Sequence, residues 1–357
     1  MHFPFCNAKC NYCDFYSASF SNEIKKSYVA ALCEQIDAYG KRLFLSADTL
    51  YIGGGTPVTL NADDLVKVIQ KAKQFGDFEE ITVEANPADS LEDTFKKLSV
   101  AGVNRISLGV QSSVQSELDL LGRRHTNEQV ISTVAAIRAA GIKNISVDLM
   151  LGIPGQTKDS LRQSVEFCLK LAPQHISAYI LKIEPNTAFG HTLPPDLPDE
   201  DQTADLYLLL CELLKEAGFE HYEISNFCKP GYESRHNLKY WQLKPYLGLG
   251  PGAHSFIDGK RFYFPRDIKA FTQNPNPIED GDGGDEKEFI MLSLRLGSGL
   301  CFEEYTKKFN KDFAKMHAEW IDILQKNGLA TVKNEHLILT EQGFLLSNTI
   351  ISNFIEK

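Results

Sequence analysis

Long hydrophobic runs are missing from this sequence. None of its uninterrupted apolar stretches approaches the roughly 20 residues that a membrane-spanning helix needs, which excludes a conventional transmembrane helix. A cationic, apolar secretory leader followed by a small-residue cleavage site is missing as well. We therefore expect a cytoplasmic protein whose eight cysteines are thiols or metal ligands and do not form a disulfide framework.

An excess of basic residues is also missing. The chain has 37 Lys and Arg against 47 Asp and Glu, a formal net charge of −10, so we do not expect it to bind nucleic acid through a broad positive surface. Its 43% hydrophobic and 24% charged residues are typical of a globular protein. A length of 357 residues suffices for one large α/β domain and a smaller one.

Short β-type segments alternate with amphipathic helical segments, at a spacing of about thirty residues that matches one βα unit. We interpret the strands as near-continuous Ile, Val and Leu runs, which predicts a parallel sheet covered on both faces. With a first strand at 2–5 there are about six such units, fewer than the eight of a complete barrel, which predicts a partial, open barrel. The other predicted strands are 48–54, 81–87, 105–111, 144–152 and 175–185. The predicted helices include 62–75, 91–101, 127–140, 158–171 and 203–217.

The pattern changes after Pro185. A Pro-rich connector (186–201) leads to an aromatic-rich stretch (221–256), and an acidic, glycine-rich segment (278–286) suggests a boundary. Helical segments and a strand pair then predict a small winged-helix-like α+β module. The predicted domains are 1–185 (partial barrel), 186–284 (barrel extension) and 285–357 (C-terminal module).

Three cysteines, Cys6, Cys10 and Cys13, have the spacing C-x3-C-x2-C. Thiolates at this spacing on a loop can converge on one metal centre. A structural zinc site is the alternative, but it usually has four ligands and paired C-x2-C units, and only His2 lies near as a fourth candidate. We interpret the triad as ligands of a four-iron cluster that leaves one iron open to a substrate or cofactor.

Polar or glycine residues are expected at the ends of four predicted strands. They are Gly53 to Gly55, Glu84, Gln111 and Asp148. In parallel βα architectures the carboxyl ends of the strands carry the chemistry, so these residues together predict a site.

An ordered set of segments resembles one family. FPFCNAKCNYCDFYS, YIGGGTPVTL, VEANP, RISLGVQS, LGRRHT, DLMLGIPGQT and YEISNF…HNLKYW resemble the HemN/HemW family of the radical S-adenosylmethionine (SAM) superfamily. This family contains oxygen-independent coproporphyrinogen III oxidases and their heme-chaperone relatives. The resemblance covers nearly the whole chain and implies a radical SAM barrel, with a [4Fe-4S] cluster on the three cysteines and SAM on the unique iron.

The same resemblance implies a set of SAM contacts. The glycines would let the backbone approach the ligand and offer N–H groups to its methionine end. For each polar contact the alternative is a side chain that caps a helix or closes a loop, and Arg124 is not assigned a role. The implied SAM contacts are Tyr12, Gly54, Gly55, Thr56, Glu84, Gln111, Arg123 and Asp148.

A departure from the oxidase pattern bears on function. The oxidases carry a further cysteine two residues after the triad, where this chain has Phe15, and this form together with HNLKYW resembles the chaperone branch. His236 is therefore a candidate heme ligand, although a histidine among aromatic residues is often a hydrogen-bonded core residue. His254 has a weaker claim, and a Cys or Met elsewhere is a further alternative.

We therefore predict a heme chaperone that delivers heme to apo-proteins, including membrane-associated respiratory ones, without classical enzymatic turnover. The alternatives are radical SAM coproporphyrinogen III oxidation, which converts propionates to vinyl groups, and a radical enzyme that acts on a different substrate. A homodimer is compatible with the sequence. The family's tyrosine six residues before the first cysteine would precede Met1, so we expect the first strand to be short.

Overall fold

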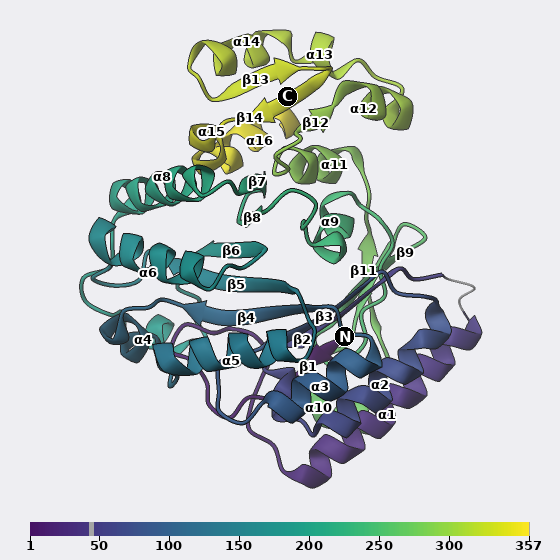
Figure 1. Cartoon of the computed structure of the whole chain (residues 1–357). Helices are drawn as coiled ribbons and strands as arrows, with labels where there is room; N and C mark the ends of the chain where they lie inside the picture. The colour runs from purple at the N-terminus through teal and green to yellow at the C-terminus, as the bar shows by residue number, and fades with distance from the viewer. Residues whose placement is uncertain (43–45, 357) are drawn as a thin grey trace.

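The computed structural model describes residues 1–42 and 46–356, and its main sheet contains six parallel strands that neighbour each other in chain order (Figure 1). Two antiparallel strands, β8 and β7, extend this sheet beyond β6. The predicted partial barrel of about six strands is therefore confirmed. The strands are β1 (His2–Phe3), β2 (Thr49–Gly54), β3 (Glu80–Ala85), β4 (Arg105–Gln111), β5 (Asn144–Leu151), β6 (His175–Ile180), β8 (Asn226–Cys228) and β7 (Glu220–Glu223).

Helices cover the outer face of this sheet and pack side by side in the order of the strands (Figure 1). Side-chain caps fix several of their first residues: the hydroxyls of Thr126 and Thr157 and the carboxylate of Asp199 each accept a backbone N–H of the helix that follows. The helix α1 and the short helix α4 were not among the predicted segments. The covering helices are α1 (Asn22–Arg42), α2 (Ala62–Ala72), α3 (Glu92–Ala101), α5 (Asn127–Ala139), α6 (Lys158–Lys170) and α8 (Glu200–Glu216), with short 3-10 turns at Pro57–Thr59 and Lys73–Phe75; α4 (Gln115–Leu121) lies beyond the carboxyl end of β4.

The prediction of near-continuous apolar strands was wrong for β4 and for most of β5. In β4 and in residues 144–148 of β5 apolar residues alternate with polar ones, and successive strand residues point to opposite faces. The apolar side chains, such as Ile106 and Val147, are fully buried under the helices. The polar set, which includes Ser107 and Asp148, therefore lines the inner face of the half-barrel.

A second, antiparallel sheet and three short helices follow the barrel. The sheet joins β9, β10 and β11, and the segment before it contributes the helix α9 near the first residues of β2 and β3. These elements are α7 (Ala188–His191), α9 (Arg235–Trp241), β9 (His254–Ile257), β10 (Lys260–Tyr263), α10 (Ile268–Gln273) and β11 (Ile278–Asp282).

The C-terminal module has a three-stranded antiparallel sheet with surrounding helices, at the top of the view in Figure 1. It shares one continuous hydrophobic core with the barrel, so the predicted domain limits remain a prediction. Among the described residues no helix is long and apolar enough to cross a membrane. The module contains α11 (Glu286–Ser293), β12 (Leu300–Cys301), α12 (Phe302–Phe309), α13 (Phe313–Met316), α14 (Ala318–Lys326), β13 (Ala330–Lys333), β14 (His336–Leu339), α15 (Glu341–Leu345) and α16 (Ser347–Ile355).

Candidate functional site

The three predicted cluster cysteines lie on one loop between β1 and α1. Cys6, Cys10 and Cys13 are all free thiols and all partly exposed. The backbone N–H of Cys6 donates to Ala18 (3.0 Å), and that of Asn11 donates to Leu121 at the end of α4 (3.0 Å). The loop is therefore held at both ends while its thiols stay accessible.

The glycine-rich segment at the end of β2 packs directly against β1 and Phe5, the residue before Cys6. A Cβ on Gly55 would lie 2.6 Å from the carbonyl oxygen of Phe5, and one on Gly54, whose φ is +113°, would lie 2.0 Å from the ring of His2. Only glycine fits these positions, because the neighbouring backbone and ring leave no space for a side chain. The glycines thus bring residue 56 next to the cysteine loop.

The N–H groups of this segment donate to other groups of the chain, and their binding to the methionine end of SAM stays a prediction. Gly55 donates to Phe3 (2.8 Å) and Thr56 donates to Phe5 (2.7 Å), while Gly54 donates to the Glu84 carboxylate (2.9 Å). A carbonyl oxygen has two lone pairs, so the carbonyls remain available to a ligand's ammonium group.

A chain of polar contacts connects two of the cysteines. The Cys6 sulfur lies 3.6 Å from the Thr56 hydroxyl, which accepts a hydrogen bond from Asn86 (2.8 Å). The Asn86 oxygen accepts from Arg123 (2.8 Å), whose other terminal nitrogen lies 3.7 Å from the Cys10 sulfur. Asn86 was missed by the sequence analysis, although it lies in VEANP directly after β3 and thus at the predicted edge.

Arg123 is the one basic side chain in that chain of contacts. It also donates to the carbonyl of Gly109, whose missing Cβ leaves room for the guanidinium. Burial alone would lower the pKa of Arg123, but the nearby Tyr12, Cys10 and Asp148 raise it. Its buried Nε has no partner among the described residues, so the site offers an unused cationic donor.

Two predicted acids lie on the inner face of the half-barrel. Glu84 accepts hydrogen bonds from Gly54 and from the Tyr51 hydroxyl (2.7 Å), and burial raises its pKa. Asp148 accepts one from Ser107 (3.2 Å), and burial raises its pKa too. Asp148 does not end its strand as predicted: it pairs with Gly109 and lies three residues before the end of β5.

The remaining predicted contacts lie at the carboxyl edge. Gln111 is the last residue of β4 and has a φ of +69°, an uncommon conformation for a residue other than glycine that often marks functional sites. Tyr12 packs against a small apolar cluster formed by Leu121, Met150, Ile153 and Phe189. The structure therefore brings all the predicted cluster and SAM residues to the cysteine-loop side of the half-barrel.

The donor set fits an iron–sulfur cluster better than a single ion. Within residues 1–42 and 46–356, no three His, Cys, Asp or Glu side chains are grouped as ligands of one metal ion. A cluster binds one thiolate per iron, so its cysteines need not converge on one point. The unpartnered Arg123 Nε fits an anionic group beside such a cluster, as the carboxylate of SAM would be.

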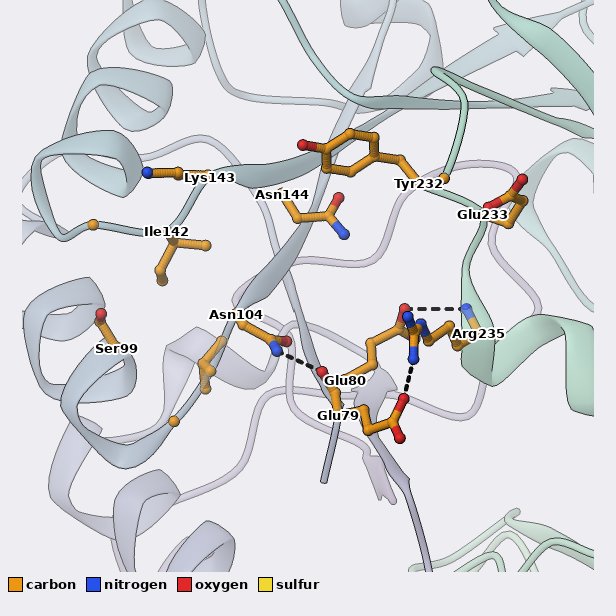
Figure 2. A pocket seen from close by; sticks show the side chains of 14 residues that line it. Glu79, Glu80, Ser99, Asn104, Ile142, Lys143, Asn144, Tyr232, Glu233 and Arg235 are labelled. Carbon is orange, nitrogen blue, oxygen red and sulfur yellow. Dashed lines mark hydrogen bonds and ion pairs between the residues drawn. The ribbon is translucent and has the colours of Figure 1, made fainter. Parts of the chain in front are cut away.

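A separate cavity of about 610 Å³ opens at the amino edge, where the strands begin (Figure 2). The loops before β4 and β5 and the segment 231–235 line it. Glu79, Arg235 and Lys143 are among its charged residues. It lies at the edge opposite to the cysteine loop.

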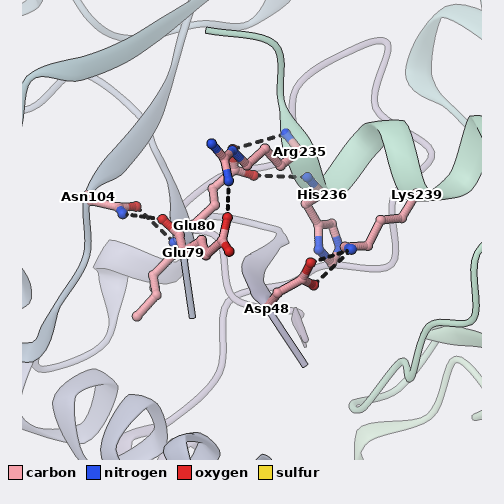
Figure 3. Close-up of polar contacts among 8 residues, drawn as sticks. Asp48, Glu79, Glu80, Asn104, Arg235, His236 and Lys239 are labelled. Carbon is pink, nitrogen blue, oxygen red and sulfur yellow. Dashed lines mark hydrogen bonds and ion pairs between the residues drawn. The ribbon is translucent and has the colours of Figure 1, made fainter. Parts of the chain in front are cut away.

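The predicted heme ligand His236 lies at this amino edge as well. Its two ring nitrogens contact the Thr49 hydroxyl (2.9 Å) and the Tyr240 hydroxyl (2.8 Å), and its ring stacks on Tyr51. The backbone N–H groups of Arg235 and His236 both donate to the Glu80 carboxylate at 3.0 Å (Figure 3). Burial lowers the pKa of His236 to about 3, so the imidazole is neutral at physiological pH. A heme iron would have to displace one of these hydroxyls, and His236 as a ligand remains a prediction.

Comparisons with known proteins agree with this geometry. Residues 1–168 match the radical SAM superfamily, and residues 287–346 match the HemN C-terminal domain. Coproporphyrinogen III oxidase (HemN) from Escherichia coli superposes with a TM-score of 0.82 at 23% identity, covering 99% of this chain and 88% of that one. This last match shows the shared fold.

Curated relatives match over their full length. Heme chaperone HemW from Haemophilus influenzae is 37% identical, covering 100% of this chain and 97% of the relative. The HemW proteins of Lactococcus lactis and Escherichia coli are 34% and 33% identical, covering 99% and 100% of this chain and 96% and 97% of the relatives. The chain therefore belongs to the HemW family of the radical SAM superfamily.

Proposed function

We propose that this protein is a heme chaperone of the radical SAM type, which binds heme and delivers it to apo-proteins. The observation that carries the proposal is the full-length identity to relatives named heme chaperone HemW. Phe15 supports it, because this residue, 67% exposed, occupies the place where the oxidases have a further cysteine.

In this proposal the cofactors bind at the carboxyl edge. Cys6, Cys10 and Cys13 hold the [4Fe-4S] cluster, which when bound supplies an open iron to SAM. Arg123 holds the SAM carboxylate, supported by its unpartnered Nε, and Asp148 accepts hydrogen bonds from the ribose hydroxyls. The other proposed SAM contacts are Tyr12, Gly54, Gly55, Thr56, Glu84 and Gln111.

Heme binds, in this proposal, at the HNLKYW helix α9 through His236. The acceptor is an apo heme protein, membrane-associated in the respiratory case, and the chaperone acts from the cytoplasm as a monomer or homodimer. Two observations make α9 suitable: its histidine is neutral, and the large cavity opens beside its first residue, Arg235.

The decisive experiment is performed without oxygen on the full chain with a reconstituted cluster. Hemin is titrated and followed by its Soret absorbance, and the heme-loaded protein is then mixed with an apo heme protein. In parallel, SAM, a strong reductant and coproporphyrinogen III are added, and products are separated by chromatography. We expect hemin binding and transfer to the acceptor, with no protoporphyrinogen.

Formation of protoporphyrinogen with an intact cluster would overturn the chaperone assignment. It would favour the alternative, an oxygen-independent coproporphyrinogen III oxidase, and would make Phe15 irrelevant to the decarboxylation. Failure of the wild-type protein to bind hemin would reject the proposal directly.

A further inference from the structure

Arg105 is a buried cation whose Nε has no hydrogen-bond partner among the described residues. It is the first residue of β4, its side chain is 2% exposed, and its residue volume makes it one of the largest fully buried side chains. Its charge acts on the Asp148 carboxyl, where it favours the ionised form, although burial raises the pKa of that carboxyl overall. Buried charges are normally paired, because an arginine cannot lose its charge in a protein.

Thr82 is a second buried residue with an unpartnered polar atom. Its hydroxyl is fully buried and also lacks a partner among the described residues. Thr82 and Arg105 are direct neighbours across β3 and β4, so their side chains point to the same inner face. Two buried donors side by side therefore lack an acceptor in this structure, and one bound acceptor group could serve both.

The acids of the protein do not supply this acceptor. Glu80, Glu84 and Asp148 lie on the same inner face, yet each carboxylate bonds other groups, described above, and none forms an ion pair with Arg105. His175 is nearby but bonds Ser146 and Tyr222 through its ring nitrogens. The charge of Arg105 acts on Asp148, but no hydrogen bond joins the two, so the Nε of Arg105 keeps a donor for an anion from outside the chain.

The amino-edge cavity lies close to this position. Asn144 and Glu80 line the cavity (Figure 2), and Asn144 pairs with Arg105 across β4 and β5, while Arg105 and Thr82 are not among the lining residues. Asn144 has a buried side-chain oxygen without a partner among the described residues. A ligand group in the cavity would have to pass Asn144 and Glu80 to reach the guanidinium of Arg105.

We propose that Arg105 and Thr82 bind a carboxylate of the porphyrin cargo that enters through the amino-edge cavity. This inference rests on the proposed function, since heme carries two propionate groups. A guanidinium binds a carboxylate through two parallel hydrogen bonds, and the Thr82 hydroxyl can donate a third. The site would place the propionate on the same edge as His236.

The test compares hemin with hemin dimethyl ester, which has the same macrocycle but no free carboxylate. We expect the full-length wild-type protein to bind hemin at least tenfold more tightly than the ester. Arg105→Gln should reduce this preference below threefold by weakening hemin alone, and Arg105→Lys should keep part of it. Thr82→Val should lower the affinity for hemin several-fold. Lys143→Gln, which removes a cation lining the same cavity, should change hemin affinity less than twofold.

Thermal unfolding separates a binding role from a structural one. Removing an unpaired buried charge should leave the melting temperature of Arg105→Gln without ligand equal to or above that of the wild type. The inference would be overturned if the melting temperature of Arg105→Gln fell by several degrees. It would also be overturned if the wild type bound hemin and its ester equally, or if Arg105→Gln preferred hemin over the ester as strongly as the wild type does.

Propionate ion alone is a second probe that does not depend on heme. It should raise the melting temperature of the wild type more than chloride at equal concentration, and should not do so in Arg105→Gln. If hemin does not bind but propionate stabilises only the wild type, the heme function fails and the carboxylate site stands. If neither binds, the site is overturned as well.

Discussion

Arg123 is the residue that connects the cysteine loop to the strand ends. Replacing it with alanine removes the donor to Asn86 and the cation beside Cys10. A hydrogen bond to a charged group contributes about 2 kcal/mol, so SAM affinity should fall roughly 30-fold. Equilibrium binding of SAM to the reconstituted protein, with iron content measured in the same samples, checks this prediction.

The neighbouring Arg124 provides the matched control. It is exposed, and its replacement by alanine should leave SAM affinity within twofold. An equal loss in both variants would show that the effect comes from the net charge of the segment and not from the contacts of Arg123.

Glu223 predicts a pH dependence of stability. It is fully buried in β7, and burial raises its pKa from 4.5 to about 7. The pKa of Glu223 is higher in the folded state than in the unfolded state. Its contribution to the free energy of unfolding is therefore complete below about pH 4.5 and is lost as the pH rises through about 7. The difference corresponds to about 3 kcal/mol as an upper estimate.

We therefore expect the unfolding free energy of the wild type to fall between pH 5 and 8. In Glu223→Gln this fall should be absent. Urea unfolding at several pH values measures this slope. Glu220→Gln, an exposed carboxylate in the same strand, should keep the wild-type slope. A variant Glu223→Gln whose slope matches that of the wild type would rule out Glu223 as its source.

At the scale of elements, α9 links the amino edge to the proposed heme ligand. Its residue Tyr240 occupies one ring nitrogen of His236. If heme iron takes that nitrogen, Tyr240→Phe should bind hemin about threefold more tightly, since a neutral hydrogen bond of roughly 0.5–1.5 kcal/mol no longer competes. His236→Ala should weaken hemin binding at least tenfold and change the Soret spectrum.

His254→Ala is the control for this pair, because His254 is an exposed histidine outside α9. It should bind hemin as the wild type does. If Tyr240→Phe weakens binding as much as His236→Ala, the pair supports the shape of α9 and does not provide the ligand.

The elements also show how far the sequence predicts this molecule. The βα period located β4 at 105–111 as observed, because short strands between capped helices leave a strong local signal. The sequence analysis missed the polar inner face. Ser107 and Asp148 each lie between two apolar residues of their strands, so these segments were interpreted as apolar runs. Contacts such as that of Asn86 with Arg123 depend on how distant segments meet, and a single sequence does not carry that information.

At the scale of the whole molecule, the barrel and the C-terminal module are joined by backbone and core contacts. Ile224 donates to the carbonyl of Arg295 (2.9 Å), and Gly297 donates to that of Tyr222 (2.8 Å). The ring of Phe344 in α15 lies 5.0 Å from that of His221 in β7. One hydrophobic core runs through both parts, so we expect them to unfold together.

The two tryptophans allow this to be measured, because Trp241 lies in α9 and Trp320 in the module. Trp320→Phe and Trp241→Phe each leave a single fluorescent reporter, and the two urea midpoints should coincide.

Phe344→Ala, which truncates a side chain that is 5% exposed, should lower the free energy of unfolding by about 3 kcal/mol and lower both midpoints equally. Val332→Ala, at a side chain that is 40% exposed, should change neither midpoint appreciably. A shift confined to Trp320 would mean that the module unfolds independently of the barrel.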